Sequence, residues 1–224
     1  MTKLLSTEQM AEFANSGCLF FEGLIDEDIN KEFLNDIGHT DIDDVDNIQH
    51  YFQNIKSSSS IPRIPAGTAL KDAYPLNSPL EKIFKNEIVS GAINSLVGSK
   101  TVVDHQFLHL TFPSKYYAKA NQRQMSQVNH QDSTIDPRTT FDIQLFYFPT
   151  AVTKEMGGTR YIPGTHLRIV NEMGIAKYQN IKGQKNIICK AGTIGIFHNG
   201  LWHGAGVNFS DDIRYMFKVR LQPT

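Results

Sequence analysis

The stretch AGTIGIFHNGLWHGAGVNFSDDIRYMFKVRL, residues 191–221, alternates short apolar runs with turn-forming residues. Its three runs are rich in β-branched and aromatic side chains, and Gly, Asn and Asp separate them, which is typical of strands joined by turns. Four similar runs precede this stretch, at residues 101–112, 141–148, 159–163 and 186–190. Seven strand signals at this spacing predict a β-barrel or β-sandwich in the C-terminal half.

The N-terminal half has helical character instead. Ser6 and Gln9 have the spacing of a capping box at the start of a short amphipathic helix. The other elements expected here are a buried strand and two helices, at residues 18–25, 26–38 and 78–98. We therefore expect one domain over residues 1–224, with a helical layer at about 1–99 and a β-rich core at about 100–224.

Two polar segments lack helical or strand periodicity. Residues 41–74 contain the run SSSS and two prolines, and residues 114–128 lead directly to a histidine. The first is interpreted as an irregular surface loop or a lid. We expect both segments to border the mouth of a cleft.

The composition is that of an ordinary globular protein. Charged residues make up 20% and hydrophobic residues 40%, with a formal net charge of −1, so neither nucleic acid nor a membrane surface is an expected partner. No apolar run approaches the ~20 residues of a membrane span, and the first residues lack a signal-peptide core. Cys18 and Cys189 are interpreted as unpaired thiols in a reducing cytoplasm. The expected partner is a small-molecule substrate, and the expected state is a monomer or a homodimer.

A metal-binding pattern lies at residues 128–133, VNHQDS. His130 and Asp132 are two positions apart, and on a β-strand such residues point to the same face. His203, in the run GLWHGAGVN, is the best candidate for a third ligand on another strand. Two histidines and one carboxylate form the facial triad of non-haem iron(II) oxygenases, although an HxD pair alone is a weak signal.

Arg214 adds a second observation in favour of this chemistry. It follows His203 by eleven residues, on the next predicted strand. A 2-oxoacid that chelates iron needs a cation for its far carboxylate, and the rigid guanidinium fork of arginine binds carboxylates bidentately. Arg214 is the candidate for this cation.

Four motifs in the same order resemble the phytanoyl-CoA dioxygenase family of iron(II)/2-oxoglutarate oxygenases. These motifs are LSTEQMAEFANSGCLFFEGLI, NHQDS, GGTRYIPGTH and FHNGLWHGAGVNFSDDIR, at residues 5–25, 129–133, 157–166 and 197–214. The resemblance implies a double-stranded β-helix, a cupin-like jelly roll that is mainly β with flanking helices. It also implies Fe(II), 2-oxoglutarate as cosubstrate and O2.

The resemblance further implies a role for each matching residue. His130, Asp132 and His203 would bind iron and form the catalytic centre, and Arg214 would bind the distal carboxylate of 2-oxoglutarate. The implied reaction oxidises a C–H bond of a small molecule, with release of succinate and CO2. Because Asp132 retains the carboxylate that related halogenases lack, hydroxylation is favoured, with desaturation, cyclisation and epoxidation as related outcomes.

The chain departs from the family pattern at two positions. Ala205 stands where many members have a serine that helps to hold the distal carboxylate, so Arg214 needs another helper. Phe146 stands where members often have a tryptophan, and with Gln144 on the same face it is expected to line the cosubstrate pocket. His109 either faces the interior and meets cosubstrate or substrate, or has a packing role.

Two readings from other classes stay open. The first is a non-catalytic metal-binding jelly-roll module, and the second is a cupin-like Zn or Mn metalloenzyme. Arg214 argues against both, because neither needs an arginine at that place. His198 is interpreted as a strand-end histidine or as a hydrogen-bonding neighbour of the site. The identity of the substrate does not follow from the sequence.

Overall fold

The computed structural model describes residues 2–39, 61–119, 121–132, 141–168, 174 and 180–224. Its strands form two sheets in which the pairings are antiparallel. The larger sheet has the order β1-β8-β5-β10-β3-β2, formed by Cys18–Phe21, Thr193–His198, Ile143–Phe148, Arg214–Pro223, Thr101–Thr111 and Thr68–Ala69. The smaller sheet has the order β4-β9-β6-β7, formed by Gln127–His130, His203–Ala205, Thr159–Tyr161 and Lys185–Asn186.

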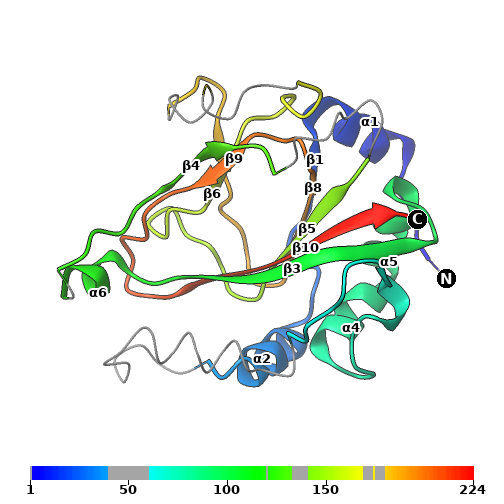
Figure 1. Ribbon diagram of the computed structural model, residues 1–224, viewed down its shortest axis with the longest axis horizontal. Helices are drawn as coiled ribbons and strands as arrows, with labels where there is room; N and C mark the ends of the chain where they lie inside the picture. The colour runs from blue at the N-terminus through cyan, green and yellow to red at the C-terminus, as the bar shows by residue number, and fades with distance from the viewer. Residues whose placement is uncertain (1, 40–60, 120, 133–140, 169–173, 175–179) are drawn as a thin grey trace.

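The helices α2 and α4 cover one face of the larger sheet, and the smaller sheet lies over the other (Figure 1). In Figure 1, α2 and α4 lie on one side of the long strands β3 and β10, while β4, β6 and β9 lie on the other. The described residues include the helices α1, α2, α4, α5 and α6, which span Thr7–Ser16, Glu27–Asp36, Pro79–Lys85, Glu87–Leu96 and Ser114–Lys119. They also include the 3-10 turn η2, Leu70–Asp72. Within the part of the chain that is described, no helix has the length and apolarity needed to cross a membrane.

Alternation along the strands divides the core in two. On β5, Leu145 and Tyr147 belong to the core that the helices share, whereas Phe146 and Phe148 belong to the core between the sheets. Phe33 of α2 packs edge-on against Tyr147, with ring centroids 5.2 Å apart. Because successive strand residues point to opposite faces, one strand supplies side chains to both layers.

This architecture confirms the predicted jelly roll with flanking helices. Two antiparallel sheets face one another, and their inward side chains form the space in which a site can be built. Among the described residues, no strand pairing joins the two sheets, so they do not close into a barrel. The capping box of α1 is also confirmed, since the Ser6 side chain accepts from the Gln9 backbone and the Gln9 side chain accepts from the Ser6 backbone.

The helix predicted at residues 78–98 is in fact two helices. Asn86 interrupts it with φ −53° and ψ 132°, a non-helical conformation. Its side-chain oxygen accepts hydrogen bonds from the backbone of Ile88 and Val89, 3.0 and 3.3 Å away, and so caps α5. Asparagine competes with the helix by this local bonding, which the apolar periodicity of the stretch concealed.

Other boundaries also differ from those expected. Of the strand predicted at 186–190, only Asn186 lies in β7, and Cys189 adds only an isolated bridge to Val152. Residues 41–60 of the polar segment 41–74 lie outside the described residues, but residues 61–74 carry β2 and η2. The polar segment 114–128 begins with α6 and ends in β4, so it is not one continuous loop.

Candidate active site

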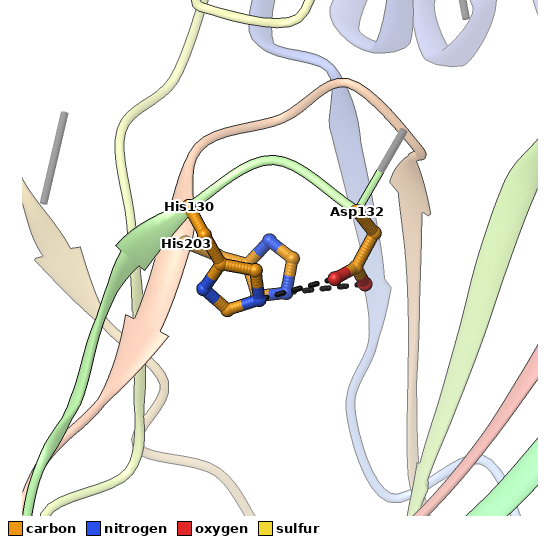
Figure 2. Close-up of side chains that lie close together, drawn as sticks. All are labelled: His130, Asp132 and His203. Carbon is orange, nitrogen blue, oxygen red and sulfur yellow. Dashed lines mark ion pairs between the residues drawn. The ribbon is translucent and has the colours of Figure 1, made fainter. Parts of the chain in front are cut away.

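Three side chains that are distant in sequence converge on one point between the sheets. Each of His130, Asp132 and His203 offers a ligand atom, and these atoms all lie within 4.8 Å of one another. His130 Nε2 is 3.0 Å from Asp132 Oδ1, and His203 Nε2 is 3.4 Å from Asp132 Oδ2 (Figure 2). This donor set of two imidazole nitrogens and one carboxylate fits iron(II) and leaves room for further ligands.

The smaller sheet places the two histidines side by side. His130 is the last residue of β4 and pairs directly with His203 on β9, with ring centroids 4.4 Å apart. Asp132 therefore follows the strand and is not part of it, unlike the expectation from the i and i+2 spacing. Gln131 fixes this departing backbone, because its buried amide donates to the carbonyls of Arg168 and Gly200, at 2.6 and 2.8 Å.

Backbone carbonyls orient both imidazole rings. His130 Nδ1 is 2.9 Å from the carbonyl of Val128, and His203 Nδ1 is 2.9 Å from the carbonyl of Leu201. A carbonyl can only accept, so each Nδ1 donates. In the neutral ring Nε2 then carries the lone pair that a metal needs, whereas a protonated ring donates from Nε2 to Asp132. Metal-binding histidines are usually oriented in this way, and both Nε2 atoms here face Asp132.

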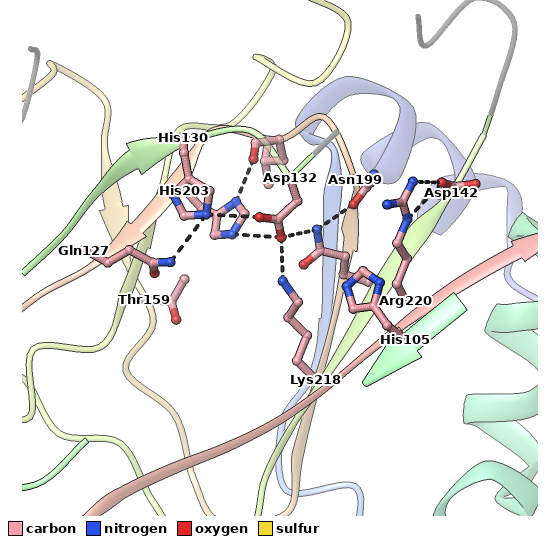
Figure 3. Close-up of polar contacts among 12 residues, drawn as sticks. His105, Gln127, His130, Asp132, Asp142, Thr159, Asn199, His203, Lys218 and Arg220 are labelled. Atoms are coloured by element: carbon pink, nitrogen blue, oxygen red, sulfur yellow. Dashed lines mark hydrogen bonds and ion pairs between the residues drawn. The ribbon is translucent and has the colours of Figure 1, made fainter. Parts of the chain in front are cut away.

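Asp132 has two further partners, Gln144 and Lys218. Lys218 Nζ donates to Asp132 Oδ2 at 2.5 Å (Figure 3). Gln144 Nε2 donates to the same oxygen, also at 2.5 Å. Burial alone would raise the pKa of Asp132, but hydrogen bonds from His130 and His203 and the charge of Lys218 outweigh burial and hold it far below its usual range. The carboxylate thus stays ionised and available to a cation.

The pKa of His130 shifts in the other direction. Burial favours the neutral ring, but the hydrogen bonds to Asp132 and to the Val128 carbonyl outweigh burial and raise the pKa of His130. Protonated His130 cannot bind a metal, so protons compete with a cation for this site.

A cavity of about 430 Å³ adjoins the triad. Its walls come from both sheets and include His203 and Ala205 of β9, Phe146 of β5, and His109, Thr111, Arg214, Met216 and Lys218 of β3 and β10. Met125, Ser126 and Gln127 also line it, which confirms that the end of segment 114–128 borders the cleft. A second cavity, of about 460 Å³, lies among η2, α4, α5 and the start of β3 and contains none of the triad residues.

Arg214 enters the cavity from the first position of β10. It is 7% exposed, and burial lowers its pKa to about 10, so it remains a cation at neutral pH. Its guanidinium donates to the carbonyls of Met156, at 2.8 Å, and of Gly157, and to Thr111 Oγ1 at 2.9 Å. Gly157 has φ 59°, and a Cβ there would lie 2.1 Å from the carbonyl of Val207, so only glycine fits this loop.

The structure places the other predicted residues as follows. Phe146 and His109 line the cavity, and burial together with the charge of Lys218 lowers the pKa of His109 to about 4. Gln144 is buried and donates to Asp132 and to Asn199 Oδ1, the second at 2.6 Å. Its other amide atom, Oε1, is buried with no hydrogen-bond partner among the described residues.

Two residues of the site were not expected from sequence: Lys218 and Thr111. Both lie on the face that Arg214 occupies, because Thr111 pairs with Arg214 across β3 and β10, and Lys218 lies four residues beyond Arg214 on β10. Alternation along the run IRYMFKVRL was the available signal, since it puts Arg214, Met216, Lys218 and Arg220 on one face.

His198 has a packing role at the end of β8. Its ring lies 5.3 Å from that of Phe141 and 5.1 Å from that of His166, between ring centroids. Its Nδ1 accepts a hydrogen bond from the backbone of Gly200 at 3.0 Å, and burial lowers its pKa to about 4. His198 thus supports the turn that leads to His203, in line with the strand-end interpretation.

Comparison with solved structures finds the same fold in several non-haem enzymes. The non-haem alpha-ketoglutarate-dependent carbocyclase SnoK from nogalamycin biosynthesis has a TM-score of 0.66 and 17% identity, covering 100% of this chain and 87% of its own. HygX from Streptomyces hygroscopicus, solved with nickel and 2-oxoglutarate bound, has a TM-score of 0.68 and 13% identity, covering 99% and 88%. The nickel complex of the non-haem monooxygenase ThoJ has a TM-score of 0.64 and 17% identity, and the match covers 95% of this chain and 76% of ThoJ. At these identities the likeness establishes the fold.

Fold and site together define an enzyme of the non-haem iron, 2-oxoglutarate-dependent oxygenase class. The family model described as phytanoyl-CoA dioxygenase (PhyH) matches residues 13–216, and the chain belongs to this family. Members of the family use Fe(II), 2-oxoglutarate and O2. No curated protein sequence matches the chain significantly.

Proposed function

We propose that this protein hydroxylates a C–H bond of a small molecule in a reaction that converts 2-oxoglutarate and O2 to succinate and CO2. The observation that carries the proposal is that one cavity joins His203 of the triad to the buried cation Arg214. A metal site without this cation would serve a structural or hydrolytic role equally well. The pairing of the two is what a dicarboxylate cosubstrate requires.

His130, Asp132 and His203 would hold the iron. Their nitrogen and oxygen donors suit Fe(II), and three protein ligands leave three positions for cosubstrate and dioxygen. The bound iron would supply the oxygen activation that amino-acid side chains cannot perform. The protein contributes the orientation of both imidazoles by carbonyls and the ionised state of Asp132.

Arg214 and Thr111 would bind the distal carboxylate of 2-oxoglutarate. Ala205 lines the same cavity but has no hydroxyl group, so it cannot act as the serine of other members does. The hydroxyl of Thr111, 2.9 Å from Arg214 Nη2, is the helper that this chain offers in its place. Because two carbonyls also bind the guanidinium, its position is set before any ligand arrives.

The substrate would approach over β3. Phe107 and His109 lie on the face that carries Lys218 and Met216, because Phe107 pairs with Lys218 and His109 with Met216. Phe107 is 50% exposed although this face looks toward the triad. An apolar ring left open beside a catalytic cavity is suited to contact with a substrate.

The Asp132 carboxylate favours hydroxylation, or a related desaturation, cyclisation or epoxidation, over halogenation, because it would occupy the position on the iron that a halide needs. Carbocyclase and epimerase reactions are named for proteins of the same fold, so the fold does not decide the product. We further propose a cytoplasmic location, with which the free thiols Cys18 and Cys189 agree. A single domain and a monomeric or homodimeric state remain predictions.

The test is succinate formation from 2-oxoglutarate under air with added Fe(II), with candidate metabolites screened for those that accelerate it. Mass spectrometry of the accelerating compound should show the gain of one oxygen atom. Loss of two hydrogens would indicate desaturation or cyclisation instead. If no succinate formed while Fe(II) bound normally, the non-catalytic module would be the better interpretation.

A further inference from the structure

Lys218 is a buried lysine in direct contact with the proposed metal ligand Asp132. It lies on β10, is 8% exposed, and its Nζ is 2.5 Å from Asp132 Oδ2 (Figure 3). Burying a lysine costs free energy unless its charge is compensated, and here the compensating group is the carboxylate that the iron would also need. The position therefore calls for a reason beyond packing.

The two oxygens of Asp132 have unequal surroundings. Oδ2 accepts hydrogen bonds from Lys218 and Gln144, both at 2.5 Å. Oδ1 lies 3.0 Å from His130 Nε2 and has no other partner among the described residues. A carboxylate oxygen has about two lone-pair sites, so two close donors occupy those of Oδ2 and leave Oδ1 as the oxygen open to a cation.

We propose that Lys218, assisted by Gln144, is a positioning residue that keeps Asp132 a one-oxygen ligand. The consequence concerns the number of open positions. Iron with three protein donor atoms retains three positions, two for the keto acid and one for dioxygen. A carboxylate that bound through both oxygens would remove one of these. The inference rests on the proposed function, because only a cosubstrate that chelates the iron needs the coordination position that a second Asp132 oxygen would occupy.

Neighbouring cations on the same face cannot take over this role. Arg220 is bound to Asp142, with Nε 3.0 Å from Oδ2, and Arg214 is bound to Thr111 and two carbonyls. Lysine suits the task because its compact ammonium group makes a hydrogen bond to one oxygen and does not bind both oxygens as a guanidinium fork does. Its charge also repels a metal ion, so Lys218 is not placed to tighten metal binding.

Because of this repulsion, a positioning role and a purely structural role of Lys218 predict different effects on metal affinity. In Lys218→Met, we expect Co(II) alone to bind at least as tightly as in the wild type, because a competing cation is gone and a second oxygen is released. We expect binding of 2-oxoglutarate to the Fe(II) protein, followed without oxygen by its charge-transfer absorption, to weaken about 10- to 100-fold. A crystal structure with Co(II) should show both Asp132 oxygens at the metal. Gln144→Met should shift both affinities in the same directions by less.

Lys82→Met is the matched control, because it removes a lysine from a 2.6 Å ion pair with Glu32 on the helical side. It should change neither affinity. The proposal would be overturned if Lys218→Met lost Co(II) affinity and 2-oxoglutarate affinity in parallel. It would also be overturned if the Co(II) structure of this variant showed one Asp132 oxygen bound and its 2-oxoglutarate affinity were unchanged. If Lys218→Met does not fold, Gln144→Met and Lys218→Arg decide the question by the same two titrations. Failure of the proposed function is distinguishable from failure of this inference, because in that case the wild type itself would form no succinate.

Discussion

The two faces of β10 are both buried, but one carries apolar side chains and the other carries charged ones. The face toward the helices carries Tyr215, Phe217, Val219 and Leu221, which are at most 1% exposed. The face toward the smaller sheet carries Arg214 and Lys218, which are 7% and 8% exposed. Burial of the first set stabilises the fold, by about 1.5–3 kcal/mol for a large apolar side chain.

The polar face gains no such stabilisation. Each charge on it is acceptable only because it has a partner, Lys218 with Asp132 and Arg214 with Thr111 and two carbonyls. On β10, therefore, the apolar face accounts for stability, and the charged face is the one to which we assign the proposed chemistry. Substitutions on the two faces should therefore separate stability from function.

The largest expected effect is the loss of turnover in His203→Ala. Removing one of three ligands leaves two donors, too few to hold iron in place. We expect succinate formation to fall to background and Co(II) affinity to fall strongly, while the thermal unfolding temperature stays close to that of the wild type. Near-normal metal affinity and activity in this variant would refute the assignment of the triad.

The opposite result is expected from Phe217→Ala, on the helical face of the same strand. Phe217 is fully buried and lies edge-on to Phe33, with ring centroids 6.3 Å apart. Its truncation should lower the free energy of unfolding by about 3–5 kcal/mol through lost burial and a cavity. Activity per folded molecule at low temperature should be retained. Denaturant unfolding and succinate assays on one preparation provide the comparison, and a selective loss of activity would contradict it.

Arg214→Ala should weaken cosubstrate binding without affecting the metal. Loss of a desolvated charge pair costs about 2–5 kcal/mol, which should appear as a higher apparent constant for 2-oxoglutarate. Co(II) affinity should not change, because Arg214 makes no contact with the triad among the described hydrogen bonds. Arg214→Lys tests whether charge alone suffices. An unchanged constant in Arg214→Ala would move the carboxylate site elsewhere.

The smallest expected effect is a pH dependence of metal affinity. The pKa of His130 is raised above its ordinary value of about 6.5, and only the neutral ring binds metal. Co(II) affinity should therefore be constant well above that pKa and fall as pH decreases through it, by up to about tenfold per pH unit. Asp132, whose pKa is lowered, stays ionised in this range. Titrations between about pH 5.5 and 8.5 would show the decline, and a flat profile would refute it.

Much of the site was accessible from the sequence because its motifs carry their own geometry. HxD, the distal histidine and the arginine eleven residues later identified the triad and Arg214, and the structure brings the triad together with Arg214 in the adjoining cavity. Periodicity likewise indicated most strands, and the spacing of Ser6 and Gln9 indicated the capping box of α1. It failed at Asn86, where a side chain binds the backbone locally, and at β7, which is only two residues long.

The sequence by itself determined the jelly roll, the candidate ligands and the candidate cation for the cosubstrate, since alternation, turn residues and motif spacing are local properties of the chain. Only the tertiary structure decided which groups surround these residues. Lys218 and Asp132 are 86 positions apart, and Arg214 and Thr111 are 103 apart, so no local pattern connects them. Their contacts depend on the register of β10 against β3 and β5 and on the packing of the smaller sheet over that face.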